Sequence, residues 1–216
     1  MIIFTNLSDV LIKGVKETKQ FVKNRYGQKM GEAYEKRLCE TNSEFAQLLR
    51  GRMSEDAYWH VVLGDEKWPF GIHDIKKILS AALRDSTPGA MSVMQSITAH
   101  PTHLPACTAE IVQGSPEIYL VSDHIMERME EIKSYHPKIF NACNRSFWSC
   151  EMSEIAADDR FFKDILKITD LQPNEAIYID TNPLNTTAAV LSGIASIIYT
   201  TPHRLKKSLM EYSFSF

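Results

Sequence analysis

The hydrophobic and polar positions of the chain follow a different pattern in each half. In the second half, short apolar runs predict buried strands at 118–121, 146–149, 176–179 and 195–199. Between these runs, apolar residues at helical spacing predict helices at 123–134, 161–168 and 185–191. Strands that alternate with helices are typical of a parallel sheet covered by helices. We therefore expect an α/β fold.

The first half begins with one more strand and continues with helices. Residues 2–4 form a short apolar run that opens into a polar loop, which predicts a strand of the same sheet. Residues 13–85 then show apolar residues near helical spacing, with a good helix start at Ser54-Glu55-Asp56. We expect residues 1–12 and 86–216 to form the α/β core, and residues 13–85 to form an inserted helical domain.

The carboxyl ends of the predicted strands are the informative positions. In open parallel sheets, ligands bind at that edge. The residues that fall there are Asn6, Ser8, Ser122, Ser149, Asp180 and Thr181.

Composition and charge exclude several classes of protein. The chain has 216 residues, 44% of them apolar, and a net charge of −3, as in ordinary globular proteins. No run of 18 apolar residues is present, so we expect no membrane span, and the pI near 6.2 gives no support for a nucleic-acid partner. The N-terminus lacks the features of a signal peptide, and the four cysteines show no metal-pair spacing. These features favour a cytoplasmic protein with reduced thiols.

A mild basic run covers the start of the predicted helical insertion. Residues 13–37 contain eight Lys or Arg against three Glu. Such a run is compatible with a solvated helix face, and also with a rim that attracts phosphate.

Several segments, in the right order, resemble one known family. Residues 2–12 resemble the opening strand and loop of the haloacid dehalogenase-like (HAD) hydrolase superfamily, and residues 151–162 and 176–194 resemble its later motifs. The helix that follows Gly51-Arg52-Met53 is similar to the cap helix of several members. The resemblance covers nearly the whole chain. It implies a three-layer Rossmannoid parallel sheet with an inserted α-helical cap.

The resemblance also implies a role for each strand end. In the family, an aspartate after the first strand attacks the substrate, and in the phosphatases a second aspartate two residues later serves as acid and base. A hydroxyl after the second strand binds the transferred group, and a lysine neutralises charge. One or two acids after a later strand hold Mg²⁺.

This chain departs from that pattern at most of these positions. Asn6 stands at the nucleophile position, Ser8 at the acid/base position and Ala156 at the lysine position. Ser122 matches the hydroxyl and Asp180 the first metal-binding acid, whereas Thr181 replaces the second acid. An amide is a very poor nucleophile, and a serine hydroxyl does not exchange protons near neutral pH as a carboxylate does.

These departures lead to a prediction about function. We expect a HAD-like protein that is non-catalytic, with a binding, regulatory or scaffold role, and with Ser122, Thr181 and Asn182 near a small anionic ligand. Mg²⁺ at Asp180 is expected to be weak or absent, because a single carboxylate remains. The loss of several roles together favours a natural, lapsed relative over an engineered Asn6 trap. The alternatives are a hydrolase of the phosphatase or dehalogenase type that acts on a small molecule between core and cap, and a protein–protein module that uses the cap. The sequence leaves the oligomeric state open.

A few other residues are compatible with a functional role as well as with a purely structural one. Asp9 is the nearest carboxylate to the vacant nucleophile position, although a role in the turn is the simpler expectation. His124 could serve as a base in the cleft, but a solvated histidine at a helix start is the simpler expectation. Lys163 is not expected to replace the missing lysine, and the pair His100 and His103 is weak evidence for a metal.

Overall fold

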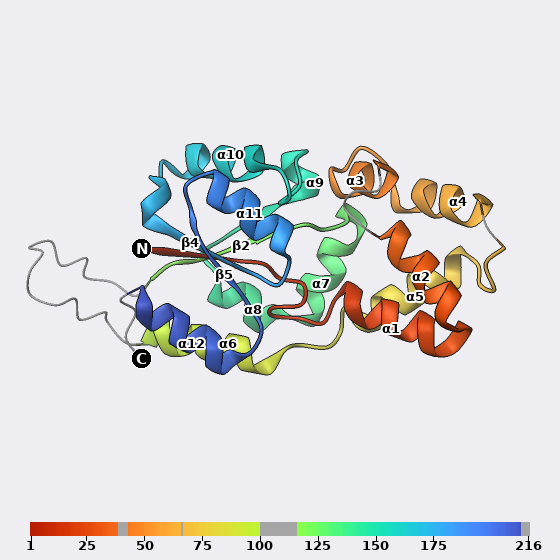
Figure 1. Cartoon of the computed structure of the whole chain (residues 1–216), viewed down its shortest axis with the longest axis horizontal. Helices are drawn as coiled ribbons and strands as arrows, with labels where there is room; N and C mark the ends of the chain where they lie inside the picture. Colours follow the sequence, from red (N-terminus) through yellow and green to blue (C-terminus); the bar gives the residue numbers. More distant parts are fainter. Residues whose placement is uncertain (39–42, 66, 100–115, 213–216) are drawn as a thin grey trace, which may run out of the picture.

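The computed structural model describes residues 1–38, 43–65, 67–99 and 116–212. Its centre is a five-stranded sheet in which all strands are parallel, in the order β3-β2-β1-β4-β5 (Figure 1). The strands are β1 (Ile2–Thr5), β2 (Ile118–Ser122), β3 (Arg145–Trp148), β4 (Ala176–Asp180) and β5 (Ala195–Ile198). The expected α/β fold with a parallel sheet is therefore confirmed.

Alternate residues of the central strand face two separate hydrophobic layers. Ile3 packs in a cluster with α6 (Pro88–Ala99), α7 (Met129–Tyr135), α8 (Pro137–Ala142) and α12 (Pro202–Glu211). Phe4 packs on the opposite face with α10 (Asp159–Thr169) and α11 (Pro183–Leu191). A strand with both faces covered is apolar throughout, because neither face meets water. The result is the three-layer arrangement of Figure 1.

Five helices lie between β1 and α6 in the chain and form a cluster of their own. They are α1 (Val15–Tyr26), α2 (Gln28–Arg37), α3 (Ser43–Leu49), α4 (Glu55–Asp65) and α5 (Ile72–Ala82). Their core is rich in aromatic residues, with Tyr34, Tyr58 and Trp59 fully buried. Ile125 and Ile155 from the sheet side also pack on this core, so the two groups of elements share a contact surface. Figure 1 shows the five helices beside one end of the sheet.

Buried polar contacts tie these helices to the rest of the molecule. Arg128, in the 3-10 turn η1 (Met126–Arg128), lies 2.7 Å from the carboxylate of Glu55, and both side chains are buried. Arg50 pairs with Asp158 at 2.5 Å, and Gly51 approaches so closely that a Cβ there would lie 2.5 Å from the carbonyl oxygen of Cys150. The helices therefore contact the sheet side at two separate places.

Several predicted elements need correction. The helix expected over 123–134 is a loop at 123–125 followed by η1 and α7, because Ile125 turns inward to pack on the helical cluster. Residue 149 begins a short helix, α9 (Ser149–Met152), and does not belong to β3. The elements α8, η2 (Pro173–Glu175) and α12 were not expected at all.

Some expectations fall outside the described residues, namely those on His100, His103, Cys39 and Cys107. Cys143 and Cys150 are free thiols. Within the described part of the chain, no helix is both long and apolar enough to cross a membrane.

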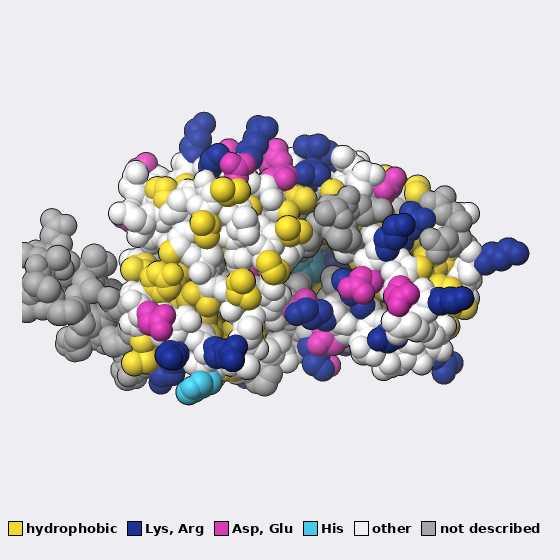
Figure 2. All heavy atoms as spheres, in the orientation of Figure 1, with side chains coloured by type: hydrophobic (Ala, Val, Ile, Leu, Met, Phe, Trp, Pro, Cys, Tyr) yellow, Lys and Arg dark blue, Asp and Glu magenta, His cyan; other side chains and the backbone are white. Residues whose placement is uncertain are grey.

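The surface differs between the two halves. Figure 2 shows hydrophobic side chains gathered over the region of α11 and β5, whereas charged side chains lie over the helical insertion and over α10. The sequence from 181 to 202 contains no charged residue. The exposed hydrophobic residues of this stretch are Leu184, Val190, Leu191 and Ile198.

Candidate functional site

The ends of three neighbouring strands bring Asn6, Ser122 and Asp180 together. Asn6 directly follows β1, Ser122 is the last residue of β2, and Asp180 is the last residue of β4. β1 lies between the other two strands, so the three side chains meet at one edge of the sheet. Ser122 and Asp180 are fully buried and Asn6 is 9% exposed.

The side-chain amide of Asn6 uses all of its hydrogen-bonding capacity. Its Nδ2 donates to Asp180 Oδ1 at 2.9 Å and to the carbonyl oxygen of Ser8 at 3.2 Å. Its Oδ1 accepts from the Leu7 N–H at 2.9 Å and from the Ser122 hydroxyl. An amide has two donor hydrogens and two acceptor lone pairs, so none is left for a ligand. The hydroxyl of Ser122 is committed to Asn6 as well.

The carboxylate of Asp180 is satisfied in the same way. Oδ1 accepts from Asn6 Nδ2 and from the Asn182 N–H at 3.1 Å, and Oδ2 accepts from the Tyr178 hydroxyl at 2.6 Å and from Asn185 Nδ2 at 2.8 Å. Four donors match the roughly four lone-pair sites of a carboxylate. Burial and the neighbouring charge of Asp180 raise the pKa of Tyr178 well above its usual value, so Tyr178 stays a proton donor.

The other predicted positions have mainly structural contacts. Ala156 is fully buried in the hydrophobic layer of α10, and its N–H donates to Asp123 Oδ1 at 2.9 Å. The side chain of Asn182 caps α11 by accepting from the Leu184 N–H at 3.0 Å. Lys163 pairs with Asp159 at 2.5 Å on an exposed helix face.

A cleft of about 370 Å³ opens beside this network, between the strand ends and the helical insertion. Its polar wall includes Asn6, Ser8, Thr181 and the start of α11. Two lysines of the basic run, Lys16 and Lys19, also line it, as do the carboxylates of Asp9 and Asp123 and the apolar side chains of Leu38, Phe45 and Leu49. Of these two lysines, Lys19 also pairs with Glu35 at 3.3 Å.

Asp9 lies in this cleft in an unusual environment. Its backbone has a left-handed φ of 62°, which Asp tolerates better than most residues. Burial is the main cause that raises the pKa of its carboxyl from 3.8 to about 6. The charges of Glu17 and Asp180 also raise this pKa, and Lys16 and Lys19 oppose the shift. Asp9 is therefore more than a turn residue, since its carboxyl faces the cleft.

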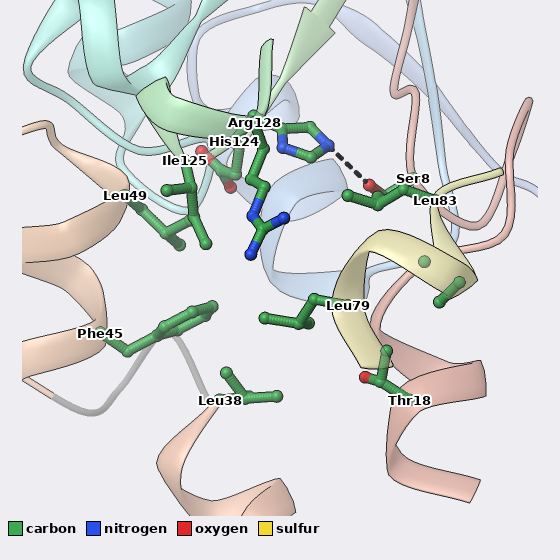
Figure 3. Close-up of a pocket in the computed structure, with 13 residues that line it drawn as sticks. Ser8, Thr18, Leu38, Phe45, Leu49, Leu79, Leu83, His124, Ile125 and Arg128 are labelled. Carbon is green, nitrogen blue, oxygen red and sulfur yellow. Dashed lines mark hydrogen bonds between the residues drawn. The ribbon is translucent and has the colours of Figure 1, made fainter. Parts of the chain in front are cut away.

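His124 is buried, contrary to the expectation of a solvated histidine. It is 7% exposed and lies in the loop before η1, with its Nε2 3.4 Å from Ser8 Oγ (Figure 3). Burial, helped by the charge of Arg128, lowers its pKa to about 4, so the imidazole is neutral near pH 7. Its Nδ1 has no hydrogen-bond partner among the described residues.

The donor set at the strand ends does not fit a magnesium ion. Mg²⁺ in proteins is bound by one or two carboxylates with free lone pairs. Both oxygens of Asp180 are occupied by protein donors, and the oxygen of Asn6 by two more. Across the ranges that the structure describes, no group of three or more His, Cys, Asp or Glu is arranged to hold a metal ion.

Comparisons with known proteins agree with this fold. No known family profile matches the chain, and no curated protein sequence matches it either. Among solved structures, a predicted HAD-like family hydrolase from Porphyromonas gingivalis is similar with a TM-score of 0.70 at 15% identity, over 98% of both chains. A HAD family enzyme from Bacteroides thetaiotaomicron, in complex with magnesium and inorganic phosphate, gives 0.62 at 14% identity, over 92% of this chain and 93% of that one. The L-2-haloacid dehalogenase from Xanthobacter autotrophicus gives 0.62 at 11% identity, over 100% and 85%.

These similarities show the fold. The chain has the HAD-like fold: a Rossmannoid parallel sheet with helical layers and an inserted group of helices. At identities of 10–15% they do not carry over an activity.

Sequence reasoning missed the partners that complete the site. Tyr178 and Asn185 both donate to Asp180, yet neither was singled out. A signal was present for Asn185, because it lies in the first turn of the helix that follows Asp180. No signal in the sequence pointed to Asp123 as a cleft residue, since it was assigned to a helix start.

Proposed function

We propose that this protein binds a small anionic molecule in the cleft at the strand ends and does not hydrolyse it by the aspartate route of the HAD family. The observation that carries the proposal is the hydrogen-bond network of Asn6. Covalent catalysis by the family route needs a free, charged oxygen at that position. The amide of Asn6 is neutral, and both its oxygen and its nitrogen are engaged by neighbours.

The remaining positions support the same proposal. Ser8 has a hydroxyl where the phosphatases of the family have an acid, and Ala156 offers a buried methyl group where they have a lysine. A transferred phosphoryl group would find neither a proton donor of suitable pKa nor a neutralising ammonium there. A substitution of the nucleophile alone would not account for the missing acid at position 8 and the missing lysine at position 156.

We also propose that the protein works without resident Mg²⁺. The Asn6 Nδ2 donates directly to Asp180. With an aspartate at position 6, two carboxylates would face each other and would need a cation between them. Binding of a metal would have to displace protein donors from a fully buried carboxylate. The anion is proposed to lie near Lys16, Lys19 and the amino end of α11, which carries a partial positive charge.

The division into core and cap, and the cytoplasmic location, belong to the same proposal. The helices α1–α5 have their own hydrophobic cluster, which supports a helical cap formed by residues 13–85. The free thiols of Cys143 and Cys150 support a reducing compartment.

An assay of hydrolysis tests the proposal. Purified protein is incubated with p-nitrophenyl phosphate and, separately, with 2-chloropropionate, each with Mg²⁺ and with EDTA. We expect no turnover above the protein-free blank, and no change in thermal unfolding on addition of Mg²⁺. The Asn6→Asp variant is expected to stay inactive, because Ser8 and Ala156 remain.

Two outcomes would overturn the proposal. Turnover by the unchanged protein that is lost in Asp180→Ala would show an active enzyme. Strong activity in Asn6→Asp alone would show that Asn6 is a trap in an otherwise complete site.

A hydrolase that uses another carboxylate is the second candidate, and Asp9 is the observation that favours it. Its carboxyl lines the cleft with a pKa of about 6, in the range useful for acid–base chemistry. This candidate would be established if turnover is abolished by Asp9→Asn but kept in Asp170→Asn. Asp170 is the matched control, because it is an exposed aspartate of similar backbone conformation.

A further inference from the structure

A side cavity of about 60 Å³ adjoins the cleft. Five residues line both spaces, so the side cavity and the cleft share one wall. The shared residues are Ser8, Leu38, Phe45, Leu49 and Asp123. Beyond them the walls are mainly apolar, with Leu79 and Leu83 from the helical insertion and Ile125 from the sheet side (Figure 3).

His124 brings a buried hydrogen-bonding atom without a partner to this wall. Its ring is 7% exposed and its Nδ1 has no partner. Figure 3 shows the imidazole at the edge of the cavity, with Ser8 on its Nε2 side. A buried nitrogen without a partner is unfavourable, so a ligand atom that pairs with it gains affinity.

Arg128, which also lines the side cavity, does not make it a site for an anion. Its guanidinium donates to Glu55 through Nε and Nη2, to Ser80 and Glu131 through Nη1, and to the carbonyl oxygen of Lys76. These five hydrogen bonds match the five N–H groups of a guanidinium. The side cavity therefore suits a neutral group, whereas the lysines lie in the cleft.

We propose that the side cavity is a subsite for the short aliphatic end of a small anion, that a neutral polar atom on this end pairs with His124 Nδ1, and that the charged end lies in the cleft near Lys16. The inference rests on the proposed binding function and adds the class of ligand. A cavity of 150 Å³ accommodates benzene, so 60 Å³ accommodates about two or three non-hydrogen atoms. A short ω-hydroxy carboxylate has these properties.

A series of straight-chain carboxylates, from acetate to octanoate, tests the subsite by isothermal titration calorimetry on the unchanged protein. Affinity should rise about fourfold for each methylene that enters the side cavity and then fall once the cavity is full. The ω-hydroxy acid of the best length should bind more tightly than the parent acid, because its hydroxyl reaches His124. Alkylamines of equal length are the opposite-charge control and should not bind.

Two variants locate the effect. Leu79→Trp fills the cavity and should abolish the dependence on chain length while leaving acetate unchanged, whereas Ala81→Trp, on an exposed position of the same helix, should behave like the parent. His124→Phe keeps the ring shape and should remove only the preference for the ω-hydroxy acid.

The contrary results are equally definite. Affinity independent of chain length, binding of alkylamines in place of carboxylates, or an unchanged series in Leu79→Trp would each overturn the subsite. These results are separate from the hydrolysis assay. Turnover would refute the binding-only function while the chain-length series still reports on the cavity, and an inactive protein without chain-length dependence would refute the subsite alone.

Discussion

The network around Asn6 and the wall around His124 lie side by side, but they differ in how well their polar groups are satisfied. Asn6 and Asp180 use every hydrogen-bonding position they have, with protein partners only. His124 has one long contact of 3.4 Å and an open nitrogen. Buried polar groups are normally paired, so an open one marks a place where something else can bind. The difference indicates that the strand-end network is satisfied by protein partners, while the adjacent wall holds a polar atom without one.

The largest effect is expected from removing the acceptor at the centre of the network. Asp180→Ala leaves three buried donors and one partly buried donor without their partner, and we expect a loss of about 3–5 kcal/mol in the free energy of unfolding, measured by urea denaturation. Tyr178→Phe removes a single donor and should cost about 1–2 kcal/mol. Nearly equal losses in the two variants would contradict a four-donor network.

An intermediate effect on the free energy of unfolding is expected from Asp9, because the contribution of its carboxyl depends on pH. Its pKa is about 6 in the folded protein and near 3.8 in the unfolded chain, so the folded state holds the proton more tightly. Stability from this group is therefore full below about pH 4 and is lost as the pH rises to about 6, a loss of roughly 2 kcal/mol after allowance for partial exposure. Lys16, Lys19, Glu17 and Asp180 all act on this carboxyl.

The Asp9→Asn variant measures the pH-dependent contribution of this carboxyl to stability. Unfolding is followed in urea at pH 4 and at pH 7, and the parent should lose about 2 kcal/mol more between the two than the variant does. Asp170→Asn is a matched control, because Asp170 also has a left-handed φ, of 56°, but is exposed. An unchanged pH profile in Asp9→Asn would show that the carboxyl is well solvated.

The smallest effect on the free energy of unfolding is expected from single hydroxyl groups, one from each of the two regions. Ser122→Ala removes a buried donor to Asn6 and should cost about 1–2 kcal/mol. Ser8→Ala removes only the 3.4 Å contact to His124 and should cost less than about 0.5 kcal/mol. Thermal and urea unfolding of both variants give the ranking, and a larger loss for Ser8→Ala would reverse the comparison.

The sequence predicted the sheet better than the site. The sequence pattern located all five strands within about a residue. The three central strands β1, β2 and β4 are mainly apolar because both of their faces are buried. The neighbouring positions of Asn6, Ser122 and Asp180 follow from the same reasoning, since strand ends meet at one edge.

The hydrogen-bonding state of the site could not be predicted in this way. Whether Asp180 is open or satisfied depends on Tyr178 and Asn185, whose directions are set by packing and not by local pattern. The burial of His124 was predicted wrongly, because a polar residue at an expected helix start is usually exposed to solvent. In the structure Ile125 packs in the helical cluster, and the adjacent His124 is buried with it. The helix α12 was missed although Thr201 and Pro202 form a normal helix start.

The central place of β1 has a consequence for how the chain folds. Ile3 pairs with Ile118 on one side and with Ile177 on the other, so β1 gains its second neighbour only after β4, far later in the chain, has been made. Such distant pairing makes folding slow, whereas the adjacent helices α1 and α2 can contact each other early. The apolar strand must therefore remain unpaired during much of synthesis, and substitutions in residues 2–5 are expected to reduce the yield of folded protein more than substitutions in the edge strand β5.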